Sequence, residues 1–329
     1  MLKPLTYLAA TAEGAFPVEG TVVCTGHFFP EITNVARCWI YRPRFGLATH
    51  SDGDKGALGA EEALSRSCNI FFYTLAQKLG PDRLREWLRR FGAGEMPGTG
   101  LARRVRTPDG REITVGESAG TLPSDEAIDR IRTSRDALTP VILGIGQGPI
   151  AWTPLQAANA YATIAREGSF QSPVLVTNAG AATPTPRRDE LELRPAAVAH
   201  ALEGLRQGVE EGHGTANHIT YGDGTRETIF EIDGVRVHGK TGTAQAPPLK
   251  LDEDGDGDTD RTINDLDHAW FAGLVGDSRR ERPRVAISVI VEHGGSGGKV
   301  AGPLAAQVIR ALMAEGYLAG SGAAPEEAP

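Results

Sequence analysis

The chain has 329 residues, 40% of them hydrophobic, and its 42 acidic and 34 basic side chains give a formal net charge of −8. This is enough apolar material for one large core or for a domain with a subdomain, and too much for a disordered chain. The negative balance argues against nucleic-acid binding, and the sequence holds no apolar run long enough to predict a transmembrane helix. The N-terminal stretch is broken by Pro4 and Glu13 and is not typical of a signal peptide.

The first predicted element is a helix over residues 2–12, where apolar residues recur at helical spacing. Gly14 ends this helix. Residues 20–57 show no long periodicity and are rich in Gly, Pro and charge, which predicts loops with short strands.

The cysteines are few, Cys24, Cys38 and Cys68, which excludes a disulfide scaffold and leaves at least one free thiol. Cys24, Cys38, His27 and His50 could ligate zinc, but their spacing contains no tight C-x-x-C pair. A disulfide between Cys24 and Cys38 would suit an oxidising compartment. The interpretation favoured here is two unpaired cysteines that are near each other only in sequence. We expect Cys68 to face the core as a small hydrophobic side chain.

Helices are predicted over residues 58–65 and 70–79, on either side of Ser67-Cys68-Asn69. The second presents a stripe of Phe and Leu that is typical of a core-facing helix. Taken alone, Ser-Cys-Asn is typical of a helix N-cap. Further elements follow in order: a helix over 82–91, a turn-rich stretch over 92–120 and a polar helix over 125–136.

The glycine-rich residues 142–149 lack the G-x-G-x-x-G order of a nucleotide-binding loop. Thr153-Pro154 predicts the start of a helix that runs to about Arg166, because an N-cap residue is followed by proline at the first helical position. Residues 171–195 show no clear element. A helix is predicted from Pro195 to Glu211.

Residues 235–239 alternate apolar and polar side chains, as a half-buried strand does, and run into Lys240-Thr241-Gly242-Thr243. Gly242 lets a ligand or another backbone approach closely, and Lys240 places a cation beside two hydroxyls. Such a strand can bind a carboxylate and aim N–H groups at a developing oxyanion. Strands over 268–275 and 285–291 are predicted to join it in an antiparallel sheet, and a helix over 303–314 follows.

The acidic run from Asp252 to Asp260 begins like a calcium-binding loop, but position twelve of such a loop would be Ile263 rather than Glu. The favoured interpretation is a solvated acidic insert. Residues 319–329 are rich in Gly, Ala, Pro and Glu, which predicts a disordered tail.

Three short motifs occur in a meaningful order along the chain. Lys3, Ser67-Cys68-Asn69 and Lys240-Thr241-Gly242 resemble the S-x-x-K, S-x-N and K-T-G motifs of serine β-lactamases and penicillin-binding proteins. Five further blocks extend the resemblance: K-P-L-T at 3–6, L-G-I-G-Q-G at 143–148, T-P-L-Q at 153–156, N-A-Y-A-T-I-A at 159–165 and H-A-W-F-A-G at 268–273. Over nearly its whole length the chain resembles the transpeptidase domain of an elongation-type class B penicillin-binding protein, similar to penicillin-binding protein 2.

The resemblance implies an α+β fold, in which an antiparallel sheet is packed by helices beside an all-helical subdomain. We expect one N-terminally incomplete domain over residues 1–318 and the tail over 319–329. In the family, the motif's serine would lie one residue before Met1. We therefore expect the nucleophile to be missing from the chain as given, which would then not be acylated. The family's first two strands also precede this helix, so we expect residues 285–291 to form an apolar sheet edge.

The function implied is D,D-transpeptidation, in which a serine attacks the penultimate D-Ala carbonyl of a peptidoglycan stem peptide and an amine from a second stem attacks the acyl-enzyme. Lys3 would take the serine proton, Ser67 would relay a proton to the leaving group, and Asn69 would hold the lysine and the substrate amide. Residues 240–243 would bind the substrate carboxylate and serve the oxyanion region. His213-Gly214-Thr215 resembles a block behind the site, with His213 structural.

No metal or organic cofactor is expected, because the hydroxyl, ammonium and oxyanion-hole donors supply the chemistry. The partners implied are peptidoglycan stem peptides, β-lactam antibiotics and a membrane glycosyltransferase of the elongation machinery, with no nucleic acid. The implied location of the full-length protein is the extracytoplasmic face of the cytoplasmic membrane, although this chain shows no signal or anchor. Two alternatives stay open: a β-lactamase or β-lactam sensor, which shares the motifs, and a non-catalytic stem-peptide-binding module.

Overall fold

The computed structural model describes residues 1–329 except 134–135, 176–185, 265, 279–281 and 319–329. The chain divides into two compact units, Leu2–Leu202 and Glu203–Pro329, and Met1 groups with the second. Each unit has its own hydrophobic core. The expected disordered tail lies outside the described residues.

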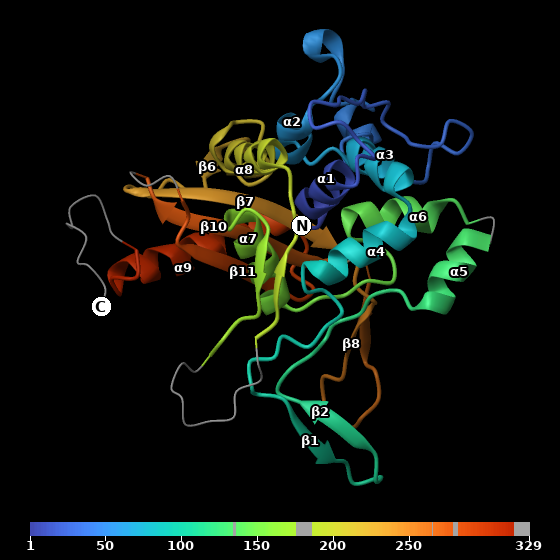
Figure 1. Ribbon diagram of the computed structural model, residues 1–329, viewed down its shortest axis with the longest axis vertical. Coiled ribbons are helices and arrows are strands. Elements are labelled where there is room, and N and C mark those ends of the chain that lie inside the picture. Colours follow the sequence, from blue (N-terminus) through green and yellow to red (C-terminus); the bar gives the residue numbers. More distant parts are fainter. Residues whose placement is uncertain (134–135, 176–185, 265, 279–281, 319–329) are drawn as a thin grey trace. The chain divides into compact units, whose positions relative to one another are not determined.

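The first unit is mainly helical, and α1 (Lys3–Ala12) is its central element. Nine of the ten residues of α1 are buried, and α3 (Asn69–Leu79) and α4 (Pro81–Arg90) pack against it (Figure 1). The predicted helices are confirmed with boundaries shifted by up to three residues. The remaining helices are α2 (Ala60–Ser65), α5 (Asp125–Thr133), α6 (Leu138–Ile142), α7 (Pro154–Ala165) and α8 (Pro195–Glu210), whose last turns belong to the second unit.

The glycine-rich segment after α6 is a packing site. A Cβ at Gly144 would lie 2.5 Å from the Ala76 Cβ of α3, so only glycine lets the two backbones approach this closely. The hydroxyl of Thr6, on α1, donates to the Gly144 carbonyl at 2.8 Å. The block therefore joins α1 to α3, in agreement with the absence of a nucleotide-loop pattern.

Helix α7 begins with a complete capping box. The Thr153 hydroxyl accepts from the Gln156 N–H at 3.1 Å, and the Gln156 side-chain oxygen accepts from the Thr153 N–H at 2.7 Å. The buried Gln156 Nε2 donates to the carbonyls of Gly92, Glu95 and Ala119 at 3.1, 2.8 and 2.8 Å. This one side chain thus ties α7 to two loops distant in sequence.

Two regions expected to lack regular structure contain short antiparallel hairpins. Strands β1 (Arg103–Arg106) and β2 (Glu112–Val115) pair within the turn-rich stretch, and β3 (Ser169–Gln171) pairs with β4 (Arg188–Glu190). The expectation for 171–195 was wrong, because strands of only three residues are too short to show the alternation that reveals a half-buried strand. At the base of the β1–β2 hairpin, the Glu117 carboxylate accepts from the N–H groups of Gly98 and Leu101.

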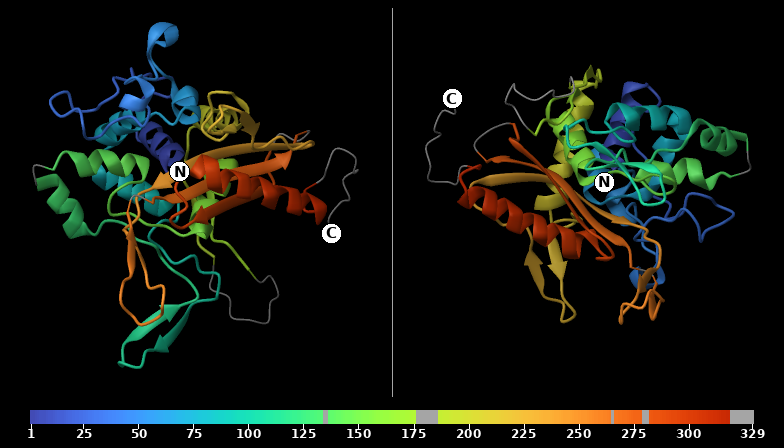
Figure 2. Two further views of the ribbon diagram at one scale, coloured as in Figure 1. Left: turned by 180° about the vertical axis from the view of Figure 1, so that it is seen from behind. Right: turned by 90° about the horizontal axis from the view of Figure 1, so that it is seen from below.

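The second unit is built on a three-stranded antiparallel sheet, as predicted, and the strand order is β11-β10-β7. The strands are β7 (Val235–Ala244), β10 (His268–Asp277) and β11 (Val285–Val291), with Lys240 opposite Ala272 and Gly242 opposite Trp270. Helix α9 (Gly302–Ala314) lies along one face of this sheet, as both views of Figure 2 show. Among the described strands β11 pairs only with β10, so it is an edge, as expected.

Besides the end of α8, the other described elements of the second unit are two hairpins and a short π-helical segment, η4 (Gly297–Ala301), which precedes α9. The hairpins are β5 (His218–Thr220) with β6 (Arg226–Thr228), and β8 (Leu249–Leu251) with β9 (Arg261–Ile263). Throughout the described residues, every helix is too short or too polar to cross a membrane.

Candidate active site

The side chain of Lys3 is at the centre of a hydrogen-bonded group in the first unit. Its Nζ donates to the Ser67 carbonyl at 2.7 Å, to the Ser67 Oγ at 2.8 Å and to the Asn69 Oδ1 at 2.7 Å. Lys3 is at the start of the buried helix α1 and is only 5% exposed. All three donor positions of an ammonium are therefore occupied inside the protein.

Burial also changes the acid–base behaviour of this lysine. Desolvation lowers the pKa of Lys3 to about 8, although charge interactions, first with Cys38 and then with Cys68, oppose the shift. A lysine with such a pKa is partly neutral near physiological pH, so it can accept a proton from a nearby hydroxyl. The charged form would keep its hydrogen bonds but could not act as a base.

The Ser67-Cys68-Asn69 turn is held in an unusual conformation. Ser67 has a φ of 57°, in the left-handed region, and Cys68 is the N-cap of α3. The Asn69 Nδ2 donates to the Arg37 carbonyl at 2.9 Å, and its backbone N–H donates to the Cys38 sulfur at 3.4 Å. With both of its amide atoms engaged, Asn69 presents its Oδ1 to Lys3 in one fixed orientation.

A second group of polar side chains lies on β7 and its surroundings, in the second unit. Lys240 is 1% exposed, and its Nζ donates to the Thr215 Oγ1 at 3.4 Å and to the Thr241 carbonyl at 3.3 Å. The Thr241 hydroxyl donates to the Thr215 Oγ1 at 3.0 Å. Thr215 was only part of a supporting block in the sequence interpretation, whereas the structure makes it the shared partner of this group, with His213 exposed beside it.

Glycine is required where β7 meets η4. A Cβ at Gly297 would collide with the backbone carbonyls of Gly242 and Trp270. This close approach brings the Gly297 N–H to the Thr243 Oγ1 at 3.4 Å. Gly242 and Thr243 therefore lie on a strand stretch whose surroundings are closely packed.

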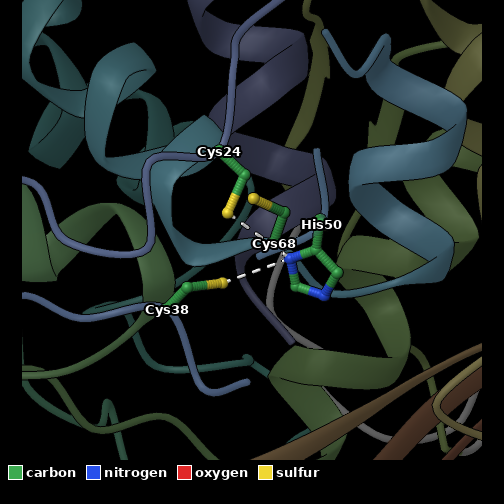
Figure 3. A group of neighbouring side chains, drawn as sticks. All are labelled: Cys24, Cys38, His50 and Cys68. Atoms are coloured by element: carbon green, nitrogen blue, oxygen red, sulfur yellow. Dashed lines mark hydrogen bonds between the residues drawn. The ribbon is translucent and has the colours of Figure 1, made fainter. Parts of the chain in front are cut away.

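The third group consists of three thiols and one imidazole, which we call the thiol–imidazole cluster: Cys24, Cys38, His50 and Cys68. All four side chains are buried, and their ligand-type atoms lie within 4.8 Å of one another. Figure 3 shows the three sulfur atoms and one edge of the imidazole converging on a common space. The three thiols are free.

The cluster corrects the sequence interpretation in two respects. Cys24 and Cys38 were expected to be close only in sequence, yet their side chains converge on His50. His27, which forms the C-x-x-H pattern with Cys24, lies outside the cluster and packs on the Tyr41 ring. Cys68 is buried in the hydrophobic core as expected, and its sulfur is also a member of the cluster.

The electrostatics of the cluster favour a thiolate at one position. Hydrogen bonding, first from Cys24 and then from Cys68, holds the pKa of the Cys38 thiol well below its usual range. A thiolate is the form of cysteine that binds metals and reacts as a nucleophile.

In the acidic loop of the second unit, carboxylates accept hydrogen bonds from the backbone of the loop itself. Asp252 accepts from the N–H groups of Gly255 and Gly257, and Asp254 accepts from that of Asp256. The carboxylates of Asp252, Asp254 and Asp260 lie together but are exposed. This agrees with a solvated insert, and Ile263 lies in β9.

Comparison with known proteins gives a family match over most of the chain. Residues 2–310 match the family described as "Penicillin binding protein transpeptidase domain". The chain belongs to this family. The mixed helix-and-sheet architecture agrees with the expected fold of the penicillin-binding transpeptidases.

Similar proteins include curated transpeptidases and solved structures. The chain is 30% identical to the peptidoglycan D,D-transpeptidase MrdA of Haemophilus influenzae over 94% of this chain and 43% of that protein. It is 28% identical to the peptidoglycan D,D-transpeptidase PbpA of Mycolicibacterium smegmatis over 95% of this chain and 54% of that protein. The chain thus spans about half the length of these relatives.

Two solved structures also match the chain over most or all of its length. The structure of PBP2 of Pseudomonas aeruginosa in complex with WCK 5153 matches with a TM-score of 0.69 and 29% identity, over 100% of this chain and 60% of that one. A chain of a peptidoglycan synthase complex, described for its coordination of polymerization and crosslinking, matches with a TM-score of 0.64 and 27% identity over 94% of this chain and 45% of that one.

Proposed function

We propose that this chain carries the serine-type D,D-transpeptidase function of its family and cross-links peptidoglycan stem peptides. The observation that carries the proposal is the buried Lys3, whose Nζ contacts both Ser67 and Asn69 and whose pKa is lowered to about 8. A lysine so placed serves as the base for a serine hydroxyl.

The family motif gives Lys3 a serine at the position directly before Met1. In the proposed reaction, that serine attacks the penultimate D-Ala carbonyl while Lys3 takes its proton. Ser67, hydrogen-bonded to Lys3, relays a proton to the departing D-Ala amine as the tetrahedral intermediate collapses. An amine from a second stem peptide then attacks the ester and regenerates the serine.

The β7 group supplies substrate recognition in this proposal. Lys240 brings a buried cation for the terminal carboxylate, and Thr241 and Thr243 bring hydroxyls on either side of Gly242. Thr215 fixes the orientation of Lys240 and Thr241 through its hydroxyl. These roles need no metal or organic cofactor, because proton transfer and charge recognition use side chains alone.

The proposed partners follow from the same reaction. β-Lactams resemble the D-Ala-D-Ala terminus and would acylate the same serine. A membrane glycosyltransferase of the elongation machinery is the proposed protein partner, in view of the similarity to a chain of a peptidoglycan synthase complex. The proposed location is the extracytoplasmic face of the cytoplasmic membrane, where the substrate lies.

The test uses two versions of the chain that differ in one residue, with serine or alanine directly before Met1. Each is incubated with a fluorescent penicillin, and the covalent adduct is measured. The serine version should form a stable adduct, and the alanine version and the chain as given should not. Equal labelling of all three would overturn the proposal, and rapid hydrolysis of the β-lactam by the serine version would indicate a β-lactamase instead.

A further inference from the structure

The turn between β11 and η4, residues 292–296, leads directly into backbone that packs on the end of β7 where the substrate is proposed to bind. This turn is held to the start of β10 by the side chain of His268, to which the proposed reaction gives no role. We propose that His268 is a positioning residue that holds the turn so that Gly297 keeps Thr243 in place for the substrate carboxylate. This rests on the proposed function, in which Thr243 belongs to the group that recognises the substrate.

The sheet ladder ends at this point, and the imidazole of His268 takes over from it. β10 pairs with β11 as far as Ala269, which lies opposite Val291. On its other side, His268 still pairs with Ala244 of β7. Beyond Val291 the chain turns, and the N–H of His293 donates to the His268 Nδ1 at 3.0 Å. A side-chain nitrogen thus satisfies a backbone donor that the ladder no longer pairs.

The donor fixes the chemical form of His268. A backbone N–H can only donate, so the Nδ1 that accepts from His293 carries no proton, and the neutral ring has its proton on Nε2. An imidazolium has an N–H on both nitrogens and could not accept this hydrogen bond. The contact therefore depends on an imidazole acceptor, and a phenyl ring of similar size could not replace it.

Further contacts join the same turn to the start of β10 and the residues just before it. The His293 Nδ1 lies 3.3 Å from the Leu266 carbonyl oxygen. The Gly295 N–H donates to the Asp267 carbonyl at 2.7 Å. The rings of His268 and His293 meet edge to face, with centroids 4.9 Å apart. His293 has a φ of 52°, in the left-handed region, so these contacts hold the turn against the backbone preference of this residue.

Gly297, four residues after His293, transmits the position of the turn to β7. A Cβ at Gly297 would lie 2.3 Å from the Gly242 carbonyl oxygen and 2.4 Å from that of Trp270, so its backbone packs directly on both strands. Its N–H donates to the Thr243 Oγ1 at 3.4 Å. Two glycines and a serine separate His293 from Gly297, and this link has little stiffness of its own. The position of Gly297 therefore depends on the contacts of the turn.

The arrangement affects substrate binding through one hydroxyl. The Gly297 N–H fixes where the Thr243 Oγ1 lies, and a hydroxyl that accepts one hydrogen bond can donate its own proton to a carboxylate. If the turn moves, this oxygen loses its fixed position and the carboxylate loses part of its binding. We therefore expect His268 to affect recognition of the carboxylate more than the chemical step, in which Lys3 acts as the base.

The first experiment needs no activity and compares amide exchange in the native chain and two variants. His268→Phe keeps a ring against His293 but removes the acceptor, and His268→Asn keeps an acceptor oxygen near the position of Nδ1. Hydrogen exchange of the Gly295 and Gly297 amides should be at least about tenfold faster in His268→Phe, and His268→Asn should restore most of the protection. Equal exchange in His268→Phe and the native chain would overturn the proposal.

A second measurement uses the native chain alone, so it does not depend on a variant that folds. Nitrogen chemical shifts of isotope-labelled imidazoles distinguish the two neutral tautomers from each other and from the imidazolium. At alkaline pH, His268 should carry its proton on Nε2 and His293 on Nδ1, because the two hydrogen bonds require these forms. A His268 ring protonated on Nδ1 could not accept from His293 and would refute the proposal.

The third experiment separates positioning from a merely structural role. In the version of the chain with serine directly before Met1, here called the serine-preceded chain, acylation is measured with a penicillin and with the methyl ester of the same penicillin. His268→Phe should lower the second-order rate constant about tenfold for the free carboxylate and less than about twofold for the ester, and His268→Asn should recover most of the loss. The control is Ile309→Val, which removes a buried methyl group from the core of the same unit and should lower the unfolding midpoint without changing this preference.

The outcomes distinguish a failure of the His268 role from a failure of the proposed function. If the native serine-preceded chain is acylated and His268→Phe keeps the native preference for the free carboxylate, His268 has no positioning role and the proposed function stands. An equal loss of preference in Ile309→Val would assign the effect to lower stability and would also refute the role of His268. If no serine-preceded version is acylated, the proposed function fails, whereas exchange of the Gly297 amide still decides whether His268 holds the turn.

Discussion

The backbone N–H of Asn69 points at the sulfur of Cys38, 3.4 Å away, across 31 residues of sequence. This contact joins two groups that the sequence presents as unrelated, because the side chain of the same Asn69 accepts a hydrogen bond from Lys3. A change at the Cys38 sulfur that rotates Asn69 would therefore also alter the hydrogen bond between Asn69 and Lys3.

The acylation rate of the serine-preceded chain should rise with pH. The neutral form of Lys3 is the base, and the pKa of Lys3 is lowered to about 8, so the rate should increase about tenfold per pH unit below 8 and level off above it. The measurement is the acylation rate of a β-lactam that does not titrate between pH 6 and pH 10. A rate that is flat over this range would show that Lys3 is not the base.

Substitution of Lys240 by alanine should slow acylation strongly while the domain stays folded. Removing a charge-assisted contact costs about 2–3 kcal/mol, which corresponds to a loss of roughly 30- to 150-fold. The matched control is Lys250→Ala, an exposed lysine on β8, which should leave the rate unchanged. Unchanged kinetics in Lys240→Ala would remove this residue from the substrate site.

Two histidines should give the stability of the chain opposite dependences on pH. Burial, followed by the charges of Arg236 and Arg206, lowers the pKa of His238 to about 4. The unfolded chain therefore binds the extra proton first, so His238 should cost about 2 kcal/mol of stability as the pH falls from 7 to 5. His238→Leu should remove this loss, provided the side chain is as well buried as the native one.

The second histidine of this pair, His200, contacts the carboxylates of Glu61 and Glu19, which raise the pKa of His200. Its stabilisation is complete below the unfolded pKa of about 6.5 and is lost as the pH rises through the folded value. His200→Gln should therefore destabilise the chain at pH 5.5 more than at pH 8. Urea unfolding at several pH values measures both effects. If the free energy of unfolding depended on pH in the same way in the two variants, the pKa shifts assigned to the two histidines would be contradicted.

Gln156 should be intolerant of substitution although it has no catalytic role in the proposed reaction. Its Nε2 donates to three carbonyls, which Gln156→Met would leave without a donor, at a cost of about 2–3 kcal/mol. Gln156→Glu should cost more, because a carboxylate would face the same carbonyl oxygens. The exposed Gln171→Glu serves as the control and should change stability by less than about 0.5 kcal/mol. Similar midpoints of unfolding for all three variants would show that the hydrogen bonds of the Gln156 side chain do not stabilise the chain.

The main helices and the central sheet were predictable from the sequence because their signals are local. Thr153 and Pro154 mark the start of α7, and the run of β-branched residues over 285–291 marks β11. The small hairpins were missed because strands such as β1 are exposed on both faces and therefore show no alternation. Short strands of this kind form because they pair with each other. Such pairing leaves no pattern in a local stretch of sequence.

The site was predictable to the extent that motifs carry it. Ser67 and Asn69 were expected beside Lys3, and the structure places them within hydrogen-bond distance of it. The convergence of Cys24 on Cys68 was not predictable, because irregular loops connect them and loop paths do not follow from spacing. His27 shows the same limit, because it is close to Cys24 in sequence but lies outside the thiol–imidazole cluster.

The β1–β2 hairpin has a consequence for how this part of the chain can change. Its strands are almost wholly exposed, and neither core includes a residue from them. The two ends of the segment meet, because a Cβ at Gly116 would collide with the Leu101 carbonyl, and Glu117 fastens the base. The segment is thus a surface hairpin whose two ends lie together. It can be lengthened, shortened or fused to a reporter at its Gly110 turn without displacing a core side chain.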